Sequence, residues 1–108
     1  MREAQIEAYL AKRVKELGGE VRKVEWVGRR SAPDRLVMLP EPPVGWSRFV
    51  DQQRACTIWV EVKNPETIKT FPADARERAQ HREHERMRAL GQRVVVVGTI
   101  EQVDELLK

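Results

Sequence analysis

Two strand-like stretches separated by a charged helical stretch constrain the fold more than any other feature of this sequence. The first is "ACTIWVEVKN" at 55–64, and the second is "RVVVVGT" at 93–99. Between them, residues 73–91 are dense in charge, and Gly91 stands where a helix cap is expected. A helix between two strands favours a crossover that joins parallel neighbours. The continuous valine run is typical of a strand that is buried on both faces.

The first half of the chain adds one helix and two strands. Apolar residues at helical spacing predict a helix over 3–17, and the Gly-Gly pair that follows predicts where it ends. Residues 20–27 alternate like a strand, and 28–34 have the composition of a turn. "RLVML" at 35–39 reads as a short apolar strand.

The remaining segments predict connections and a last helix. Residues 40–54 contain three prolines and no clear period, which predicts an irregular insertion between two strands. Residues 65–75 read as a loop, and Thr99 is a candidate N-cap for a C-terminal helix. We therefore expect a single α/β domain over residues 1–108, with a central mixed β-sheet flanked by helices.

Composition limits the compartment and the kinds of partner. The net charge is +3, which permits a polyanionic partner without requiring one. The lone cysteine, Cys56, excludes an internal disulfide and a thiolate metal site, and we expect it simply to pack. No apolar run is long enough to span a membrane, so we expect a cytoplasmic protein.

The strand at 55–64 contains two charges in an unusual place. Side chains alternate between the faces of a strand, so Glu61 and Lys63 point the same way, on the face opposite Ile58, Val60 and Val62. A sheet with one solvated face explains this pattern without any function. Asp34 suggests another explanation, although a Pro-Asp pair is also ordinary turn chemistry.

Asp34 precedes the strand at 35–39, which can pair with the strand at 55–64 as an antiparallel hairpin. Asp34 and Glu61 would then meet, and two carboxylates repel each other unless a cation lies between them. Oxygen ligands without a cysteine or a convincing histidine pair select a hard cation such as Mg²⁺ or Mn²⁺. Lys63 beside that cation would suit phosphodiester hydrolysis.

The ordered set of motifs resembles the VRR-NUC (virus-type replication-repair nuclease) branch of the PD-(D/E)xK nuclease superfamily. The matching segments are "EAQIEAYL" before the Gly-Gly, "GRRSAPDRLVML", "VEVKNP" and "QHREHERMRALGQRVVVV". The resemblance covers nearly the whole chain and implies a restriction-endonuclease-like fold. The sequence departs from the family at Ser31, where the family usually has glycine, so a positive φ at this position would be strained.

The resemblance also implies roles for individual residues. Asp34 and Glu61 would be metal ligands, with the backbone carbonyl of Val62 as a third. Lys63 would be the catalytic lysine, and Gln80 would match a helix glutamine that points at the active site. A glutamate of the N-terminal helix completes the set. It is either Glu3 or Glu7, and we favour Glu7 because it shares a helix face with the apolar residues.

The activity implied is that of a Mg²⁺- or Mn²⁺-dependent DNA endonuclease, encoded by a bacterium or phage and associated with the nucleoid. Stand-alone members of the branch resemble junction-resolving enzymes, so we expect a homodimer that cuts branched DNA such as four-way (Holliday) junctions, with a helicase or other replication-repair protein as a partner. One alternative is an inactive nucleic-acid-binding module that keeps the fold, and another is a small adaptor domain.

Other charged and aromatic residues have weaker interpretations. Arg29, Arg30 and Arg35 surround Asp34, so we expect them to contact phosphates. The arginines of residues 73–91 alternate with acids, which predicts a solvated helix. We expect two further pairs to have structural or surface roles: His81 and His84 on the helix surface, and Trp46 and Phe49 packed onto the domain, with base stacking as the alternative.

Overall fold

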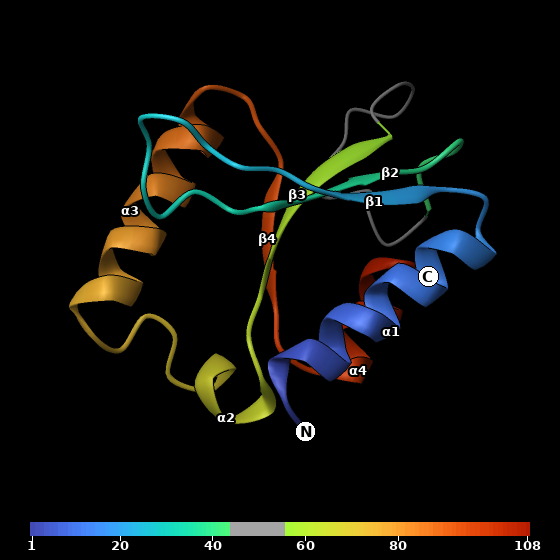
Figure 1. Cartoon of the computed structure of the whole chain (residues 1–108), viewed down its shortest axis with the longest axis horizontal. Coiled ribbons are helices and arrows are strands. Elements are labelled where there is room, and N and C mark those ends of the chain that lie inside the picture. The colour runs from blue at the N-terminus through green and yellow to red at the C-terminus, as the bar shows by residue number, and fades with distance from the viewer. Residues whose placement is uncertain (44–55) are drawn as a thin grey trace.

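The computed structural model describes residues 1–43 and 56–108, and these form one mixed sheet with four helices (Figure 1). The helices are α1 (Glu3–Glu16), α2 (Pro65–Ile68), α3 (Ala75–Ala89) and α4 (Ile100–Leu106). The strands are β1 (Glu20–Lys23), β2 (Arg35–Met38), β3 (Thr57–Val62) and β4 (Val94–Val97). Most of the expected insertion at 40–54, with Trp46 and Phe49, lies outside the described residues.

The strands are ordered β1-β2-β3-β4 across the sheet. The first three form antiparallel neighbours, while β3 and β4 run parallel. The crossover between β3 and β4 contains α2 and α3, as the sequence pattern predicts for two parallel strands joined through a helix. The mixed α/β fold expected from the sequence is confirmed.

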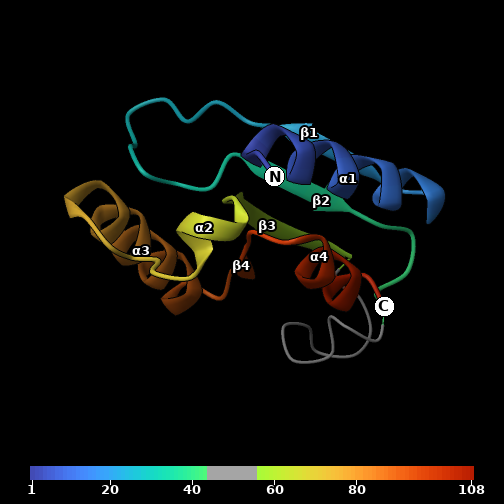
Figure 2. The same cartoon turned by 90° about the horizontal axis from the view of Figure 1, so that it is seen from below.

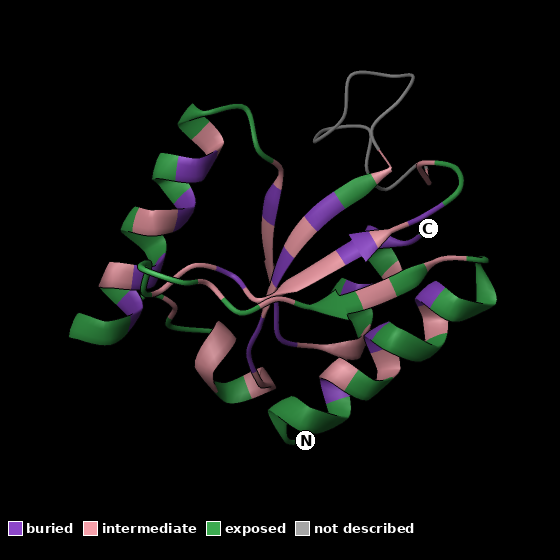
Figure 3. Cartoon of the chain, turned by 45° about the horizontal axis from the view of Figure 1, so that its top comes forward, coloured by how far each residue is buried: buried purple, intermediate pink, exposed green. Residues whose placement is uncertain are grey.

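The helices lie on both sides of the sheet, and the main core lies under α1 and α4. These two helices contact each other, whereas α3 stands across β3 and β4 from them (Figures 1 and 2). Buried residues form a stripe along α1, visible in Figure 3. The core side chains from α1, the strands and α4 include Ile6, Leu10, Val14, Val37, Ile58, Val60, Val62, Val97, Val103 and Leu106.

Two strands differ from their expected form. The strand expected at 20–27 ends at Lys23, and Val27 beyond it is 96% exposed because the chain has left the sheet to form the turn before β2. In β4, Val94 and Val97 are buried but Val95 and Val96 are only partly buried. This strand is at the edge of the sheet, so burial on both faces was predicted too strongly.

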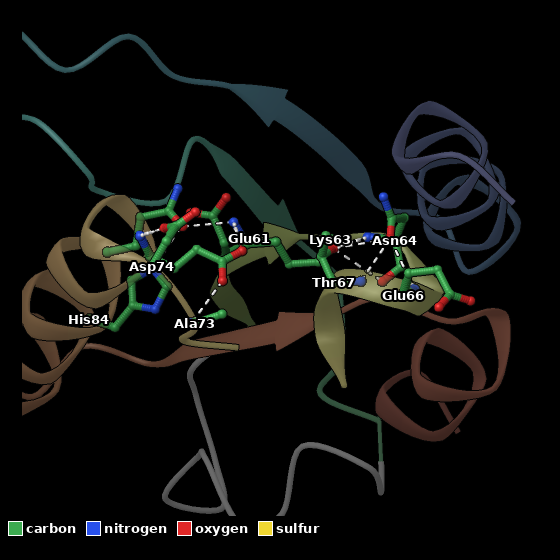
Figure 4. Close-up of polar contacts among 10 residues, drawn as sticks. Glu61, Lys63, Asn64, Glu66, Thr67, Ala73, Asp74 and His84 are labelled. Carbon is green, nitrogen blue, oxygen red and sulfur yellow. Dashed lines mark hydrogen bonds and ion pairs between the residues drawn. The ribbon is translucent and has the colours of Figure 1, made fainter. Parts of the chain in front are cut away.

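One helix was missed because its start signals were read as a loop. Asn64 is the N-cap of α2, and its side chain accepts hydrogen bonds from the backbone N–H groups of Glu66 and Thr67. Pro65 occupies the first turn, where its missing N–H has no cost. Figure 4 shows this cap directly after Lys63. The helix therefore fixes the chain where it leaves β3.

No helix in the described part of the chain is both long and apolar enough to cross a membrane.

Candidate active site

Strand β3 separates its apolar and charged side chains between two faces. Val60 and Val62 are buried in the core beneath α1 and α4. Glu61 points to the opposite side and lines a pocket. Lys63 follows the strand and is only 4% exposed. The expectation of one solvated sheet face therefore fails for Lys63, which is covered by other elements.

Four carboxylates from three elements line this pocket, which has a volume of about 610 Å³. Glu3 and Glu7 come from α1, Asp34 precedes β2, and Glu61 lies on β3. The other lining residues are Arg30, Ser31, Ala32, Val62, Arg76, Ala79 and Gln80. We call this the acidic pocket, and it brings together all the residues predicted as metal ligands.

The register of the sheet explains why Asp34 and Glu61 share the pocket. Arg35 pairs with Val60 in the antiparallel β2–β3 ladder. Continuing this register by one residue places Asp34 opposite Glu61, as the hairpin argument from the sequence anticipated. Asp34 is still tied to the sheet, because its carbonyl accepts a hydrogen bond from the Val24 N–H at 2.9 Å.

Arg35 links two of the four carboxylates. Its guanidinium lies 3.0 Å from a carboxylate oxygen of Glu7 and 3.0 Å from one of Asp34. The positive charge offsets the repulsion between the two acids. Because Arg35 already contacts two carboxylates, it has less capacity to bind a phosphate than the sequence suggested.

Glu3 also belongs to the acidic pocket. Its pKa is raised above the usual 4.5, first by burial and then by the neighbouring negative charges of Glu7 and Glu61, while Lys63 and Arg76 act in the opposite direction. Both glutamates considered for the N-terminal helix therefore line the pocket. Of these two glutamates, Glu7 is the one that forms an ion pair with Arg35.

Lys63 is held between two side chains of α3. Its ammonium donates a 2.7 Å hydrogen bond to Gln80 Oε1 and lies 3.6 Å from a carboxylate oxygen of Glu77. The ammonium also lies 5.1 Å from the centre of the Phe71 ring. Gln80, which the resemblance implies points at the active site, lines the acidic pocket and contacts Lys63. Sequence reasoning missed Glu77, although it stands one helical turn before Gln80.

Comparison with known proteins finds a relative and a solved structure that are similar to most of the chain. No family model matches the chain. A protein named "Putative nuclease p44", from Acyrthosiphon pisum secondary endosymbiont phage 1, is 37% identical over 97 residues, covering 90% of this chain and 83% of that protein. A solved structure described as "VRR_NUC domain" superimposes with a TM-score of 0.68 at 38% identity, covering 96% of this chain and 91% of that one.

The chain belongs to the VRR-NUC family. Both similarities extend over most of the chain, and the solved structure is similar to this chain in fold as well as in sequence. This VRR-NUC chain therefore has the restriction-endonuclease-like fold expected from its motifs.

His84 corrects the surface position expected for the histidines of α3. His81 is exposed, but the side chain of His84 is completely buried, with Nε2 3.5 Å from Glu61 Oε1. Phe71 stacks on its ring at a centroid distance of 6.0 Å. Neither ring nitrogen has a hydrogen-bond partner within residues 1–43 and 56–108. The helical spacing could have predicted this burial, because His84 lies one turn after Gln80 on the same face of the helix.

The turn before β2 is anchored to α3. Arg29 donates hydrogen bonds of 3.1 and 2.6 Å to the two carboxylate oxygens of Glu83. This pairing raises the pKa of Arg29 above its usual value. Between this anchor and Asp34, Ser31 adopts a φ of +68°. The position therefore has the left-handed conformation that favours glycine, and serine accepts it with strain.

The donor set of the acidic pocket suits a hard divalent cation in kind. Carboxylate oxygens are the ligands that Mg²⁺ and Mn²⁺ prefer, and the pKa of Glu3 is raised by burial first and then by the negative charges of Glu7 and Glu61. Within the described ranges, however, no three His, Cys, Asp or Glu side chains are gathered closely enough to hold a metal ion. Glu7 and Asp34 are drawn to Arg35 instead.

Proposed function

We propose that this VRR-NUC chain, folded as one domain over residues 1–108, is a metal-dependent endonuclease that hydrolyses phosphodiester bonds in DNA. The observation that supports it best is the convergence of four carboxylates in one pocket, whose lining residue Gln80 accepts a hydrogen bond from the buried Lys63. The phage relative is named as a nuclease, which supports hydrolysis of phosphodiester bonds as the reaction.

Asp34, Glu61 and Glu7, with the Val62 carbonyl, would hold Mg²⁺ or Mn²⁺. The bound ion would supply Lewis acidity toward a phosphoryl oxygen. Because Glu7 and Asp34 contact Arg35 in this structure, these two side chains would have to turn from the guanidinium toward the ion.

Lys63 would act beside the metal, next to the pocket-lining Gln80. Its ammonium offsets the negative charge that builds on the phosphoryl oxygens and helps to orient the attacking water. Gln80 and Glu77 hold that ammonium in place. No covalent intermediate with the protein is needed, because water is the nucleophile.

We further propose a homodimer that acts on branched DNA such as four-way junctions. One pocket of this size cuts one strand, whereas a two-fold pair of subunits supplies two sites with matching symmetry. Cytoplasmic action at the nucleoid beside a helicase is part of this proposal. The second candidate is a nucleic-acid-binding module without catalysis, which is favoured because no three carboxylate or histidine side chains of the described residues are close enough to hold a metal ion.

A cleavage assay distinguishes these candidates. Purified protein is incubated with labelled four-way junction, flap, splayed arm, linear duplex and single strand, each in Mg²⁺, Mn²⁺ or EDTA. We expect metal-dependent cuts that Lys63→Ala and Asp34→Asn abolish and that Lys12→Ala, on the exposed face of α1, leaves unchanged. Asp34→Asn guards against misfolding of the lysine variant, because its side chain is 47% exposed. Binding without cuts in either metal would favour the inactive module.

A further inference from the structure

A second hollow adjoins the acidic pocket. It has a volume of about 400 Å³ and lies between the turn at 29–31 and α3. Arg30, Ser31 and Ala79 line both hollows, so the two lie side by side. We call the second hollow the basic trough because its other charged residues are Arg29, Arg82, Glu83 and Arg86.

The sign of the charge reverses between the two hollows. Four carboxylates and two arginines line the acidic pocket. Four arginines and a single glutamate line the basic trough. That glutamate, Glu83, is bound by Arg29, so this pair contributes little net charge. Three positive charges remain, on Arg30, Arg82 and Arg86.

The acids that alternate with arginines along α3 do not neutralise these three. Glu77 turns inward to Lys63, and Glu85 lies 2.7 Å from Arg88. Arg88 also donates to the Val94 carbonyl, so it fixes α3 to β4. Across residues 1–43 and 56–108, by contrast, the guanidinium groups of Arg30, Arg82 and Arg86 make no hydrogen bond or ion pair. The alternation of acids and arginines along the helix therefore leaves a net positive charge on this face.

We propose that the basic trough binds the sugar-phosphate backbone of the nucleic-acid strand beside the bond that is cut. This inference rests on the proposed nuclease function and adds a second site to it. Arg82 and Arg86 are four residues apart on α3, about 6 Å along the helix axis, a distance comparable to that between successive phosphates. Arg30, shared by both hollows, binds the phosphate nearest the reacting one.

Binding in EDTA tests the trough without any cleavage. Fluorescence anisotropy with labelled single-stranded and duplex oligonucleotides compares the wild type with Arg82→Gln/Arg86→Gln. The matched control is Lys12→Gln/Lys15→Gln, which removes the same charge from exposed positions of α1. We expect the trough variant to raise Kd on the order of tenfold at low salt and to reduce the slope of log K against log salt by about 2. Equal losses in both double variants would overturn the proposal.

Kinetics separate this inference from the proposed function. With Mg²⁺ or Mn²⁺, we expect Arg82→Gln/Arg86→Gln to lose more kcat/KM on a long strand than on a dinucleotide, which is too short to reach the trough. Equal losses on the two substrates would refute the trough. Absence of metal-dependent cleavage by the wild type would refute the proposed nuclease and leave the EDTA binding result as the test of the trough.

Discussion

His84 and Glu61 face each other across the boundary between α3 and β3, with Nε2 3.5 Å from Oε1 and the histidine side chain completely buried (Figure 4). Stacking of Phe71 on the imidazole restricts the movement of the ring. Since Glu61 is a proposed metal ligand, His84 is in a position to orient it without touching substrate.

Replacing His84 with phenylalanine should therefore weaken metal activation. His84→Phe keeps a ring against Phe71 but removes the nitrogen that faces Glu61. We expect the Mn²⁺ concentration for half-maximal cleavage to rise on the order of tenfold or more, as for other residues that orient metal ligands. A titration of activity with Mn²⁺ measures this. His81→Phe, on the exposed face of the same helix, is the control. An unchanged Mn²⁺ midpoint in His84→Phe would show that the histidine only fills space.

Gln80 should determine where the Lys63 ammonium lies. Gln80→Ala removes the acceptor 2.7 Å from Lys63 Nζ and leaves the ammonium with Glu77 and the Phe71 ring. We expect kcat to fall on the order of 100-fold, since small misplacements of a reacting group have effects of this size. KM for DNA should change little. Single-turnover cleavage measures the chemical step, and a loss confined to KM would contradict the positioning role.

Ser31 should limit stability. Its left-handed conformation costs a residue with a Cβ about 1–2 kcal/mol in the folded state, and glycine avoids this cost. Against this gain, glycine lowers the free energy of unfolding by about 0.4–1 kcal/mol because its unfolded chain is more flexible. We expect Ser31→Gly to raise the free energy of unfolding by about 0.5–1 kcal/mol. Urea denaturation measures it. Ser31→Ala is the control, because alanine keeps the Cβ and should bring no gain.

Glu3 should make stability depend on pH. Its raised pKa means that the folded chain binds this proton more tightly than the unfolded chain does. The resulting stabilisation is present below pH 4.5 and is lost as the pH rises through the pKa of the folded state. We expect the difference in unfolding free energy between Glu3→Gln and wild type to grow in favour of the variant above pH 4.5 and then level off. Urea melts across pH measure it, with the exposed Glu41→Gln as control; a constant difference would contradict the assignment.

Glu3 and Glu7 can also be separated as metal ligands. We expect Glu7→Gln to reduce metal-dependent cleavage more than Glu3→Gln, because only Glu7 shares Arg35 with Asp34. Activity at saturating Mn²⁺ compares the two variants. A larger loss in Glu3→Gln would transfer the role to Glu3.

The features predicted well from the sequence have local causes. The helix at α1 follows from apolar spacing, and the location of Asp34 and Glu61 in one pocket follows from alternation and a hairpin register. The N-cap at Thr99 is also local, and its side chain accepts the Gln102 N–H. In each case, residues close in sequence or directly paired across strands determine the outcome.

The features that were missed depend on contacts between distant elements. Burial of His84 depends on how α3 docks against β3, and the helix pattern alone showed only a charged surface. The bond from Arg29 to Glu83 joins residues 54 positions apart. Likewise, the sequence predicted that Arg35 contacts phosphate, because it did not reveal that Glu7 of α1 lies beside the guanidinium. The hydrophobic periodicity of a helix or strand does not show which distant residues it will contact.

The bridge from Arg35 to Glu7 and Asp34 has a consequence for how activity can be controlled. Arg35 offsets the repulsion between two of the four carboxylates, so we expect the chain to fold without a divalent ion. Under the proposed function, folding and activation become separate events. Chelation of the metal would then leave the enzyme folded but inactive, and the concentration of available metal would determine whether DNA is cut.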